Sequence, residues 1–241
     1  WSVRIGLRNE VCLPERNLLM NILLTNPSSR LSRELAQCLG SSHEVELSAG
    51  PFGHEEPTDA LVRGKNAIIH SLNTDKTLGD VERLDEAMRQ TYNLLWAAAE
   101  HKVEKFLFLG SLSTMSSYDL DFLVNEKWKP VPTTDINILS HHMSEFVCRE
   151  FGREKNIDVR CLRLGELCWD KQINSSFPLL GEDAIQAIGK VLTKDISSSW
   201  PGSFLIPPTT WHVFHIQSST PEVRFSTQKA QDLLSYLPTE V

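Results

Sequence analysis

Cysteine is scarce in this sequence, and the few cysteines are widely separated. The 241 residues include five, at Cys12, Cys38, Cys148, Cys161 and Cys168. So small and scattered a set excludes a disulfide framework and a zinc knuckle, and we predict no metal site. The odd number favours a reducing intracellular compartment. Cys161 and Cys168 flank a strand-like stretch, and we expect both to be core residues rather than ligands.

The sequence also lacks an excess of positive charge and a long apolar run. Lys and Arg number 24 and Asp and Glu number 31, which gives a formal net charge of -7. Unspecific binding to nucleic acid or to an anionic membrane needs a basic face, so we expect neither partner. No apolar run approaches the roughly 18 residues of a membrane span. The chain begins at Trp1 with neither Met nor a signal-peptide pattern, as expected of a processed or trimmed piece of a longer protein.

Apolar runs of strand length alternate along the chain with segments of helical periodicity. We expect strands at 18–25, 45–47, 66–72, 105–110, 158–164 and 211–217, and helices at 30–39, 80–101, 137–155, 182–193 and 225–234. Residues 49–57 are rich in Gly and Pro and are expected to form a loop. Strands that alternate with helices predict an α/β protein with a doubly wound parallel sheet.

Three segments occur in an order and spacing that are more specific than any one of them. Asn66–Leu72 is a strand-like run with a histidine near its end. Arg89–Ser113 combines a helix that ends in alanines with a strand that ends in serines, and Leu162–Gly165 has the pattern Leu-Arg-x-Gly. Together they resemble the extended short-chain dehydrogenases/reductases, the family of NAD-dependent epimerases and dehydratases. The resemblance covers about residues 21–165.

The resemblance implies a Rossmann-like fold with a reduced C-terminal lobe. We expect one NAD(P)-binding domain over residues 1–241, with its core at 18–165 and the reduced substrate lobe at 166–241. In relatives this lobe closes over a sugar nucleotide, so a smaller lobe leaves less surface for such a substrate. Its aromatic residues could line a pocket, although aromatic residues at such spacing are usually core. They are Trp200, Phe204, Trp211 and Phe214.

The family's cofactor loop, Thr-Gly-x-x-Gly-x-x-Gly, corresponds here to Thr25–Ser32. Its glycines make a tight turn, let backbone N–H groups approach the pyrophosphate, and let helix and strand pack closely. Their positions hold Asn26, Ser29 and Ser32. Asn tolerates left-handed backbone angles better than most residues, so we expect Asn26 to keep the turn. Ser29 places a Cβ where the pyrophosphate would approach.

Two interpretations of this loop remain open. In one, the loop binds phosphate through Ser28, Ser29 and Arg30, and Arg30 stands where NADP-preferring relatives often have a basic residue. In the other, which we favour, the loop is an ordinary strand-to-helix turn whose serines cap the helix. The family's ribose-binding acid is missing, since Ser48 stands there and Glu46 comes one or two residues early. If NAD(P) binds, the resemblance implies these contacts: Thr25, Ser28, Ser29, Arg30, Leu31, His70, Ser71 and Leu72.

The family's catalytic serine, tyrosine and lysine correspond to Ser111, Asn137 and His141. In relatives the tyrosine is the general acid/base, and the lysine one helical turn later lowers its pKa and binds the nicotinamide ribose. An amide cannot exchange a proton near neutral pH, so Asn137 removes a contribution of about 10²- to 10⁴-fold in rate. His141 or His142 could act as a base, but adjacent histidines on a helix more often serve surface or packing. Tyr118 could reach the site if its loop folds back.

The combined substitutions favour a non-catalytic member of the family, acting as a nucleotide-binding, structural or interaction module. The alternative is an active NAD(P)-dependent epimerase, dehydratase or reductase that uses His141 or Tyr118. An RNA-associated relative is a third interpretation, which the acidic charge disfavours. The expected partners are a dinucleotide and either another protein or a second copy of the chain. Relatives often dimerise through the helices that correspond to 80–101 and 137–155.

Overall fold

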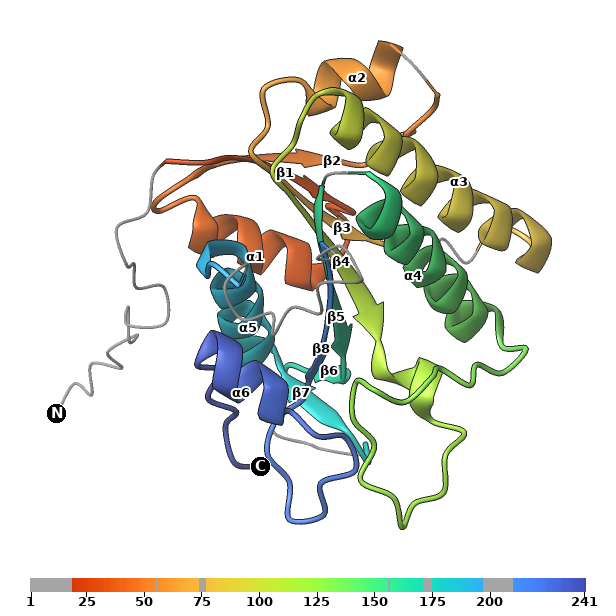
Figure 1. Ribbon diagram of the computed structural model, residues 1–241, viewed down its shortest axis with the longest axis vertical. Helices are drawn as coiled ribbons and strands as arrows, with labels where there is room; N and C mark the ends of the chain where they lie inside the picture. Colours follow the sequence, from red (N-terminus) through yellow and green to blue (C-terminus); the bar gives the residue numbers. More distant parts are fainter. Residues whose placement is uncertain (1–18, 55, 74–76, 156, 171–174, 197–209) are drawn as a thin grey trace, which may run out of the picture.

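A computed structural model of the chain describes residues 19–54, 56–73, 77–155, 157–170, 175–196 and 210–241. A central sheet is covered by helices on both faces (Figure 1). Its strands are β1 (Asn21–Thr25), β2 (Glu44–Ser48), β3 (Ala67–Ser71), β4 (Lys105–Ser111), β5 (Asp158–Leu164) and β8 (Trp211–Ile216). They follow the order β2-β1-β3-β4-β5-β8, and every neighbouring pair is parallel. The predicted doubly wound parallel sheet is confirmed.

The helices form two layers, and each layer buries its own apolar cluster against the sheet. One layer contains α1 (Arg30–Leu39), α5 (Gly181–Thr193) and α6 (Gln228–Leu234), and the other contains α2 (Glu56–Val62), α3 (Asp80–Glu100) and α4 (Ile136–Glu154). Adjacent strand residues point to opposite faces, so Leu23 packs toward α3 while Leu24 packs toward α1. Continuous apolar strands such as β4 are needed because both faces are covered. Within the described ranges, no helix combines the length and apolar character of a membrane-spanning segment.

The structure differs from the sequence-based expectations at several element boundaries. The loop expected at 49–57 is shorter, because α2 begins at Glu56. Pro57 lies in the first turn of α2, where a missing N–H costs no hydrogen bond. The last helix begins at Gln228 rather than at Phe225, which is buried and forms a bridge to Val124. The short strands β6 (Glu166–Cys168) and β7 (Pro178–Leu180) were not predicted, because three residues carry too little periodicity.

The core expectations for the cysteines and aromatic residues are largely confirmed. Cys161 is fully buried, as predicted, but Cys168 is partly exposed in β6, so its placement in the core was wrong. A two-stranded sheet outside the main one leaves that side chain at an edge. Phe214 is buried against α5 and α6, and Trp211 packs beside the α3 and α4 cluster. Trp200 and Phe204 lie outside the described residues.

A buried ion pair fixes α4 against the end of β5. The Arg163 guanidinium donates to the Glu145 carboxylate, with Nη2–Oε1 at 2.5 Å and Nε–Oε2 at 3.0 Å. Both side chains are almost fully buried, at 4% and 7% exposure. Burial alone would lower the pKa of Arg163, but the hydrogen bonds and charge of Glu145 raise it above its usual value. His141 lies one helical turn before Glu145, so this pair also sets its position.

Gly181, at the start of α5, gives a test of the packing beside the cofactor-loop helix. An added Cβ there would lie 2.1 Å from the Trp169 ring. We predict that Gly181→Ala lowers the free energy of unfolding by roughly 1–3 kcal/mol, as overpacking does. In the same helix, a Cβ added to Gly189 meets nothing within 4 Å, so Gly189→Ala should raise stability by up to about 1 kcal/mol. Urea denaturation measures both, and effects of the same sign would contradict the packing described.

Candidate functional site

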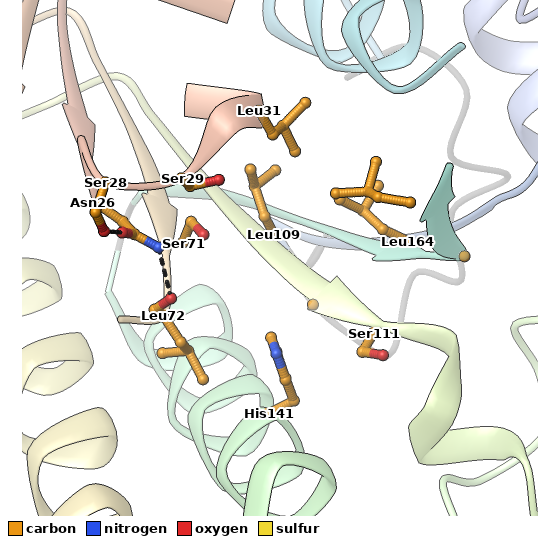
Figure 2. Close-up of a pocket in the computed structure, with 13 residues that line it drawn as sticks. Asn26, Ser28, Ser29, Leu31, Ser71, Leu72, Leu109, Ser111, His141 and Leu164 are labelled. Carbon is orange, nitrogen blue, oxygen red and sulfur yellow. Dashed lines mark hydrogen bonds between the residues drawn. The ribbon is translucent and has the colours of Figure 1, made fainter. Parts of the chain in front are cut away.

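A cavity, called here the main cavity, lies where the carboxyl ends of β1, β3, β4 and β5 meet. This is the point where the order of strands reverses, between β1 and β3, and ligands of doubly wound sheets bind there. The cavity has a volume of about 370 Å³, and Figure 2 shows the side chains that line it. It brings together seven of the predicted site residues: Ser28, Ser29, Leu31, Ser71, Leu72, Ser111 and His141.

Sequence reasoning missed about half of the cavity wall. The missed residues follow or end the same parallel strands, and that position was the available signal. They are Asn26, Leu109, Gly110, Leu164, Gly165 and Leu167.

Asn26 makes the turn that glycine makes in the family pattern, as expected. Its φ of 56° lies in the left-handed region. Its side chain then reinforces the turn, because Nδ2 donates to the Leu72 carbonyl at 2.9 Å and Oδ1 accepts from the Ser28 hydroxyl at 2.7 Å (Figure 2). The loop after β1 is thereby tied to the loop after β3.

The start of α1 leaves hydrogen-bond donors at the cavity. Ser29 occupies the N-cap position, but its side chain makes no capping hydrogen bond, so the predicted serine cap is wrong. The Ser28 hydroxyl is already engaged with Asn26. Among the described residues, the backbone N–H groups of Arg30, Leu31 and Ser32 have no acceptor. Unsatisfied N–H groups and the positive end of a helix dipole are features of anion sites.

Ser32 fills the third glycine position without separating helix and strand. Its side chain is buried, and its hydroxyl donates to the Thr25 carbonyl at 3.1 Å. The hydrogen bond holds α1 against the end of β1. Close packing is retained with a different residue, because the serine hydroxyl supplies a contact that a glycine lacks.

Thr25 and His70, both predicted to contact a cofactor, lie behind the wall of the main cavity. The Thr25 hydroxyl is 3.1 Å from His70 Nδ1 and accepts from the Ser71 N–H at 2.9 Å. His70 Nε2 is 3.0 Å from the Thr91 hydroxyl, which itself donates to the Ala87 carbonyl. Thr91 must therefore accept, which assigns the proton to Nε2. Burial, with a smaller effect of His141, lowers the pKa of His70 to about 3, so the ring is a neutral structural group.

Arg30 points away from the main cavity. Its guanidinium stacks over the Trp169 ring at 4.4 Å from the centroid, and its Nε lies 3.7 Å from Glu34. Arg30 is the first residue of α1 and faces α5 rather than the strand ends. Among the described residues that form the cavity wall there is no Lys or Arg, and His141 is the one titratable side chain.

Two of the three catalytic positions face the main cavity, and the third does not. Ser111 lines it, and its hydroxyl accepts from the Ser113 N–H at 3.1 Å. His141 rises toward it from α4 (Figure 2), and burial lowers its pKa to about 4. Asn137 is exposed and accepts a hydrogen bond from Arg83 on α3, outside the wall of the cavity.

Tyr118 also lies outside the main cavity. Its hydroxyl donates to the Lys129 carbonyl at 2.7 Å, and its ring packs edge-on against Trp128 at 4.8 Å. The loop holds the phenol by these contacts, away from Ser111.

No family model and no curated protein matches the chain. Solved structures share its fold. A glucuronic acid dehydrogenase from Chromohalobacter salexigens has a TM-score of 0.73 at 16% identity, covering 92% of this chain and 85% of that one. A UDP-glucuronic acid 4-epimerase from Bacillus cereus, in complex with NAD, has a TM-score of 0.71 at 14% identity, covering 91% and 94%. A short-chain dehydrogenase/reductase superfamily protein from Agrobacterium tumefaciens, with bound NAD, has a TM-score of 0.69 at 13% identity. The match covers 90% of this chain and 92% of that one.

The chain has the short-chain dehydrogenase/reductase fold. The resemblance predicted from the sequence is confirmed at that level. The N-terminus of α1 and the ends of β3, β4 and β5 surround the strand-order reversal, so the main cavity lies where doubly wound sheets bind their ligands.

The residues present fit the pyrophosphate of a dinucleotide better than its adenosine. The phosphate end has the three N–H groups of α1. At the adenosine end, the Ser48 hydroxyl is engaged with the Gly50 N–H, and Glu46 is paired with Lys65 at 2.6 Å. A small cavity beside Phe52, at this adenosine end, has a volume of about 50 Å³. This is enough for a few waters rather than a purine.

The neutral histidine of the main cavity makes stability depend on pH. His141 has a folded-state pKa of about 4, below the unperturbed 6.5. As pH falls below 6.5, the unfolded chain takes up a proton that folded His141 refuses until about pH 4, so stability is lost over that window. When the pH is lowered from 7 to 5, we predict that the free energy of unfolding falls by roughly 2 kcal/mol less in His141→Asn than in the wild type. Urea denaturation at both pH values tests this, and equal losses would contradict it.

Proposed function

We propose that this chain is a non-enzymatic nucleotide-binding protein built on the short-chain dehydrogenase/reductase fold. One observation carries the proposal: the main cavity keeps the backbone of a phosphate-binding loop, while the acid/base position has left the cavity. Asn26 supplies the left-handed turn, and the free N–H groups of α1 supply donors. Asn137 is bonded to Arg83 instead of facing Ser111.

The phosphate end supports binding of an anionic ligand. Backbone donors at a helix N-terminus bind phosphate without a cationic side chain, and this suits a wall whose one titratable group, His141, is neutral. Two neighbours in the fold hold NAD. A bound nicotinamide dinucleotide supplies hydride transfer, because its oxidised form accepts a hydride and its reduced form donates one. In this chain Ser28, Ser29 and Leu31 would hold its pyrophosphate.

Among the described residues, the three side chains considered for the acid/base role are poor replacements for the family tyrosine. The Asn137 amide does not titrate near neutral pH. His141 has a pKa of about 4 and would be a weak base at pH 7. Tyr118 is held elsewhere by the Lys129 carbonyl. The alternative, an active epimerase, dehydratase or reductase, therefore rests on His141 alone.

A negative charge at the cofactor loop tests nucleotide binding. We expect NAD, NADH, NADP or NADPH to raise the melting temperature of the wild type, and Ser29→Asp to abolish that shift because its carboxylate would repel the pyrophosphate. Ser42→Asp is the charge-matched control, since Ser42 is exposed beyond the far end of α1. Thermal-shift titration measures all three proteins. Absence of a shift with all four dinucleotides, or a shift that survives in Ser29→Asp, would count against the proposal.

A second experiment separates binding from chemistry. We expect no formation of NADH from NAD and glucuronate, the type of substrate named for one structural neighbour, because the general acid/base is missing. Absorbance of NADH at high protein concentration gives the readout. Turnover that is lost in both Ser111→Ala and His141→Ala would establish the active alternative instead.

The expectations about partners and compartment stay predictions. Aromatic side chains are exposed on the two long helices, with Tyr92 and Trp96 on α3 and Phe146 on α4. Arg149 stacks on Phe146 at 4.7 Å and Lys155 lies over Trp96 at 5.3 Å, so the surface mixes charge with aromatic area. A second copy of the chain is the partner we expect there, and a reducing intracellular compartment is the expected location.

A further inference from the structure

A second sizeable cavity lies at the carboxyl end of β8, apart from the main cavity. We call it the α6 cavity. It has about 280 Å³ and is enclosed by the segment after β8, the beginning of α6 and the loop that contains Leu123. It shares no wall residue with the main cavity. Its volume is just below the roughly 300–1,000 Å³ of ligand pockets, so it suits a ligand of about one ring.

The wall of the α6 cavity is polar but carries no charged side chain. Its hydrogen-bonding groups are hydroxyls and amides, from Gln217, Ser218, Ser219, Ser226, Thr227, Gln228 and Gln231. The remainder of the wall is aliphatic, from Leu123, Val223 and Pro238. Such a wall offers nothing that would neutralise an anion or a cation. It matches a neutral ligand that has several hydroxyls and also a C–H surface.

Gln217 is the reason to expect a ligand there. It is 1% exposed and lines the α6 cavity, and its Oε1 has no hydrogen-bond donor among the described residues. Native proteins seldom leave a buried amide oxygen without a donor, and an exception calls for an explanation. A ligand O–H that donates to Gln217 would complete its hydrogen bonding.

Other groups of the wall have hydrogen-bonding capacity left. Gln231 Nε2 donates to the Thr227 hydroxyl at 2.8 Å, which leaves the Thr227 hydrogen and the Gln231 carbonyl oxygen for a ligand. The Ser219 hydroxyl makes no hydrogen bond within the described part of the chain. The wall of the α6 cavity therefore offers both donors and acceptors, and the hydroxyls of a sugar ring can pair with either.

We propose that the α6 cavity binds a neutral hexopyranose, with Gln217 accepting from a ring hydroxyl and Leu123 and Val223 packing on the C–H face. The site is independent of nucleotide binding in the main cavity. A free monosaccharide and the neutral end residue of an oligosaccharide present the same ring, so both sources are tested.

Saturation-transfer NMR on the full chain tests the site with glucose, galactose, mannose and maltose, and with glucuronate as the charged comparison. We expect transfer to at least one neutral sugar and none to glucuronate. Tighter binding of maltose than of glucose would identify a glycan end, and the reverse a free sugar. Gln217→Leu and Gln231→Ala should each weaken binding roughly tenfold, the effect of one lost hydrogen bond.

Three variants separate loss of sugar binding from misfolding and from nucleotide binding. Gln37→Leu alters an exposed amide on α1 and should leave sugar binding unchanged. If Gln217→Leu fails to fold, as circular dichroism would show, Gln231→Ala at an exposed position in the middle of α6 still tests the site. Ser29→Asp should also leave sugar binding intact, which separates this result from nucleotide binding. Transfer to no neutral sugar, equal transfer to glucuronate, or transfer unaffected by both cavity variants would overturn the proposal.

Discussion

The hydroxyl of Thr25 joins the two strands between which the order of the sheet reverses. It accepts from the Ser71 N–H and contacts His70, which is held in turn by Thr91 on α3. The pairing of β1 with β3 ends at Leu24 and Ile69, and the chain then leads to helices on opposite faces, so the Thr25 hydroxyl extends the contact between the two strand ends. Asn26 adds a second link to the Leu72 carbonyl just above it. The main cavity depends on this junction, because every group at its phosphate end extends from one of the two joined loops.

The other end of the main cavity depends on buried charge. Arg163 and Glu145 are both nearly inaccessible, and a buried pair is strongly destabilising to break because one charge would be left alone. The pair fixes both the rotation of α4 about its axis and the position of α4 along β5. Consequently His141, one turn earlier, faces the cavity, whereas Asn137 at the first turn faces Arg83. The orientation of α4 therefore decides which of its side chains reach the cavity.

The phosphate end and the adenosine end of the nucleotide site that we propose differ in the contacts they offer. At the phosphate end, the Asn26 and Ser32 side chains form hydrogen bonds to neighbouring backbone carbonyls and hold the turn in place. At the adenosine end, the acid that would bind a ribose is absent, and Glu46 is used by Lys65. Backbone geometry is recovered by several side chains, but a carboxylate that binds a specific hydroxyl has no substitute. This asymmetry favours a ligand that is recognised mainly through its phosphates.

The sequence by itself determined the sheet, its helical layers and the substituted positions. Apolar runs such as 105–110 and 158–164 have to be strands that are covered on both faces, since nothing else buries them. Left-handed tolerance at Asn26 also follows from residue type alone. These features are local or periodic, and a sequence displays them directly.

The tertiary structure alone decided where the side chains go. Arg30 stacks on Trp169, about 140 positions later in the chain, and Asn137 bonds to Arg83 on another helix. Ser29 occupies the N-cap position of α1 but makes no capping hydrogen bond, although its residue type favours one. The α6 cavity needs three segments to converge, and no periodicity signals it. Contacts between distant segments depend on packing in three dimensions, which composition and spacing do not specify.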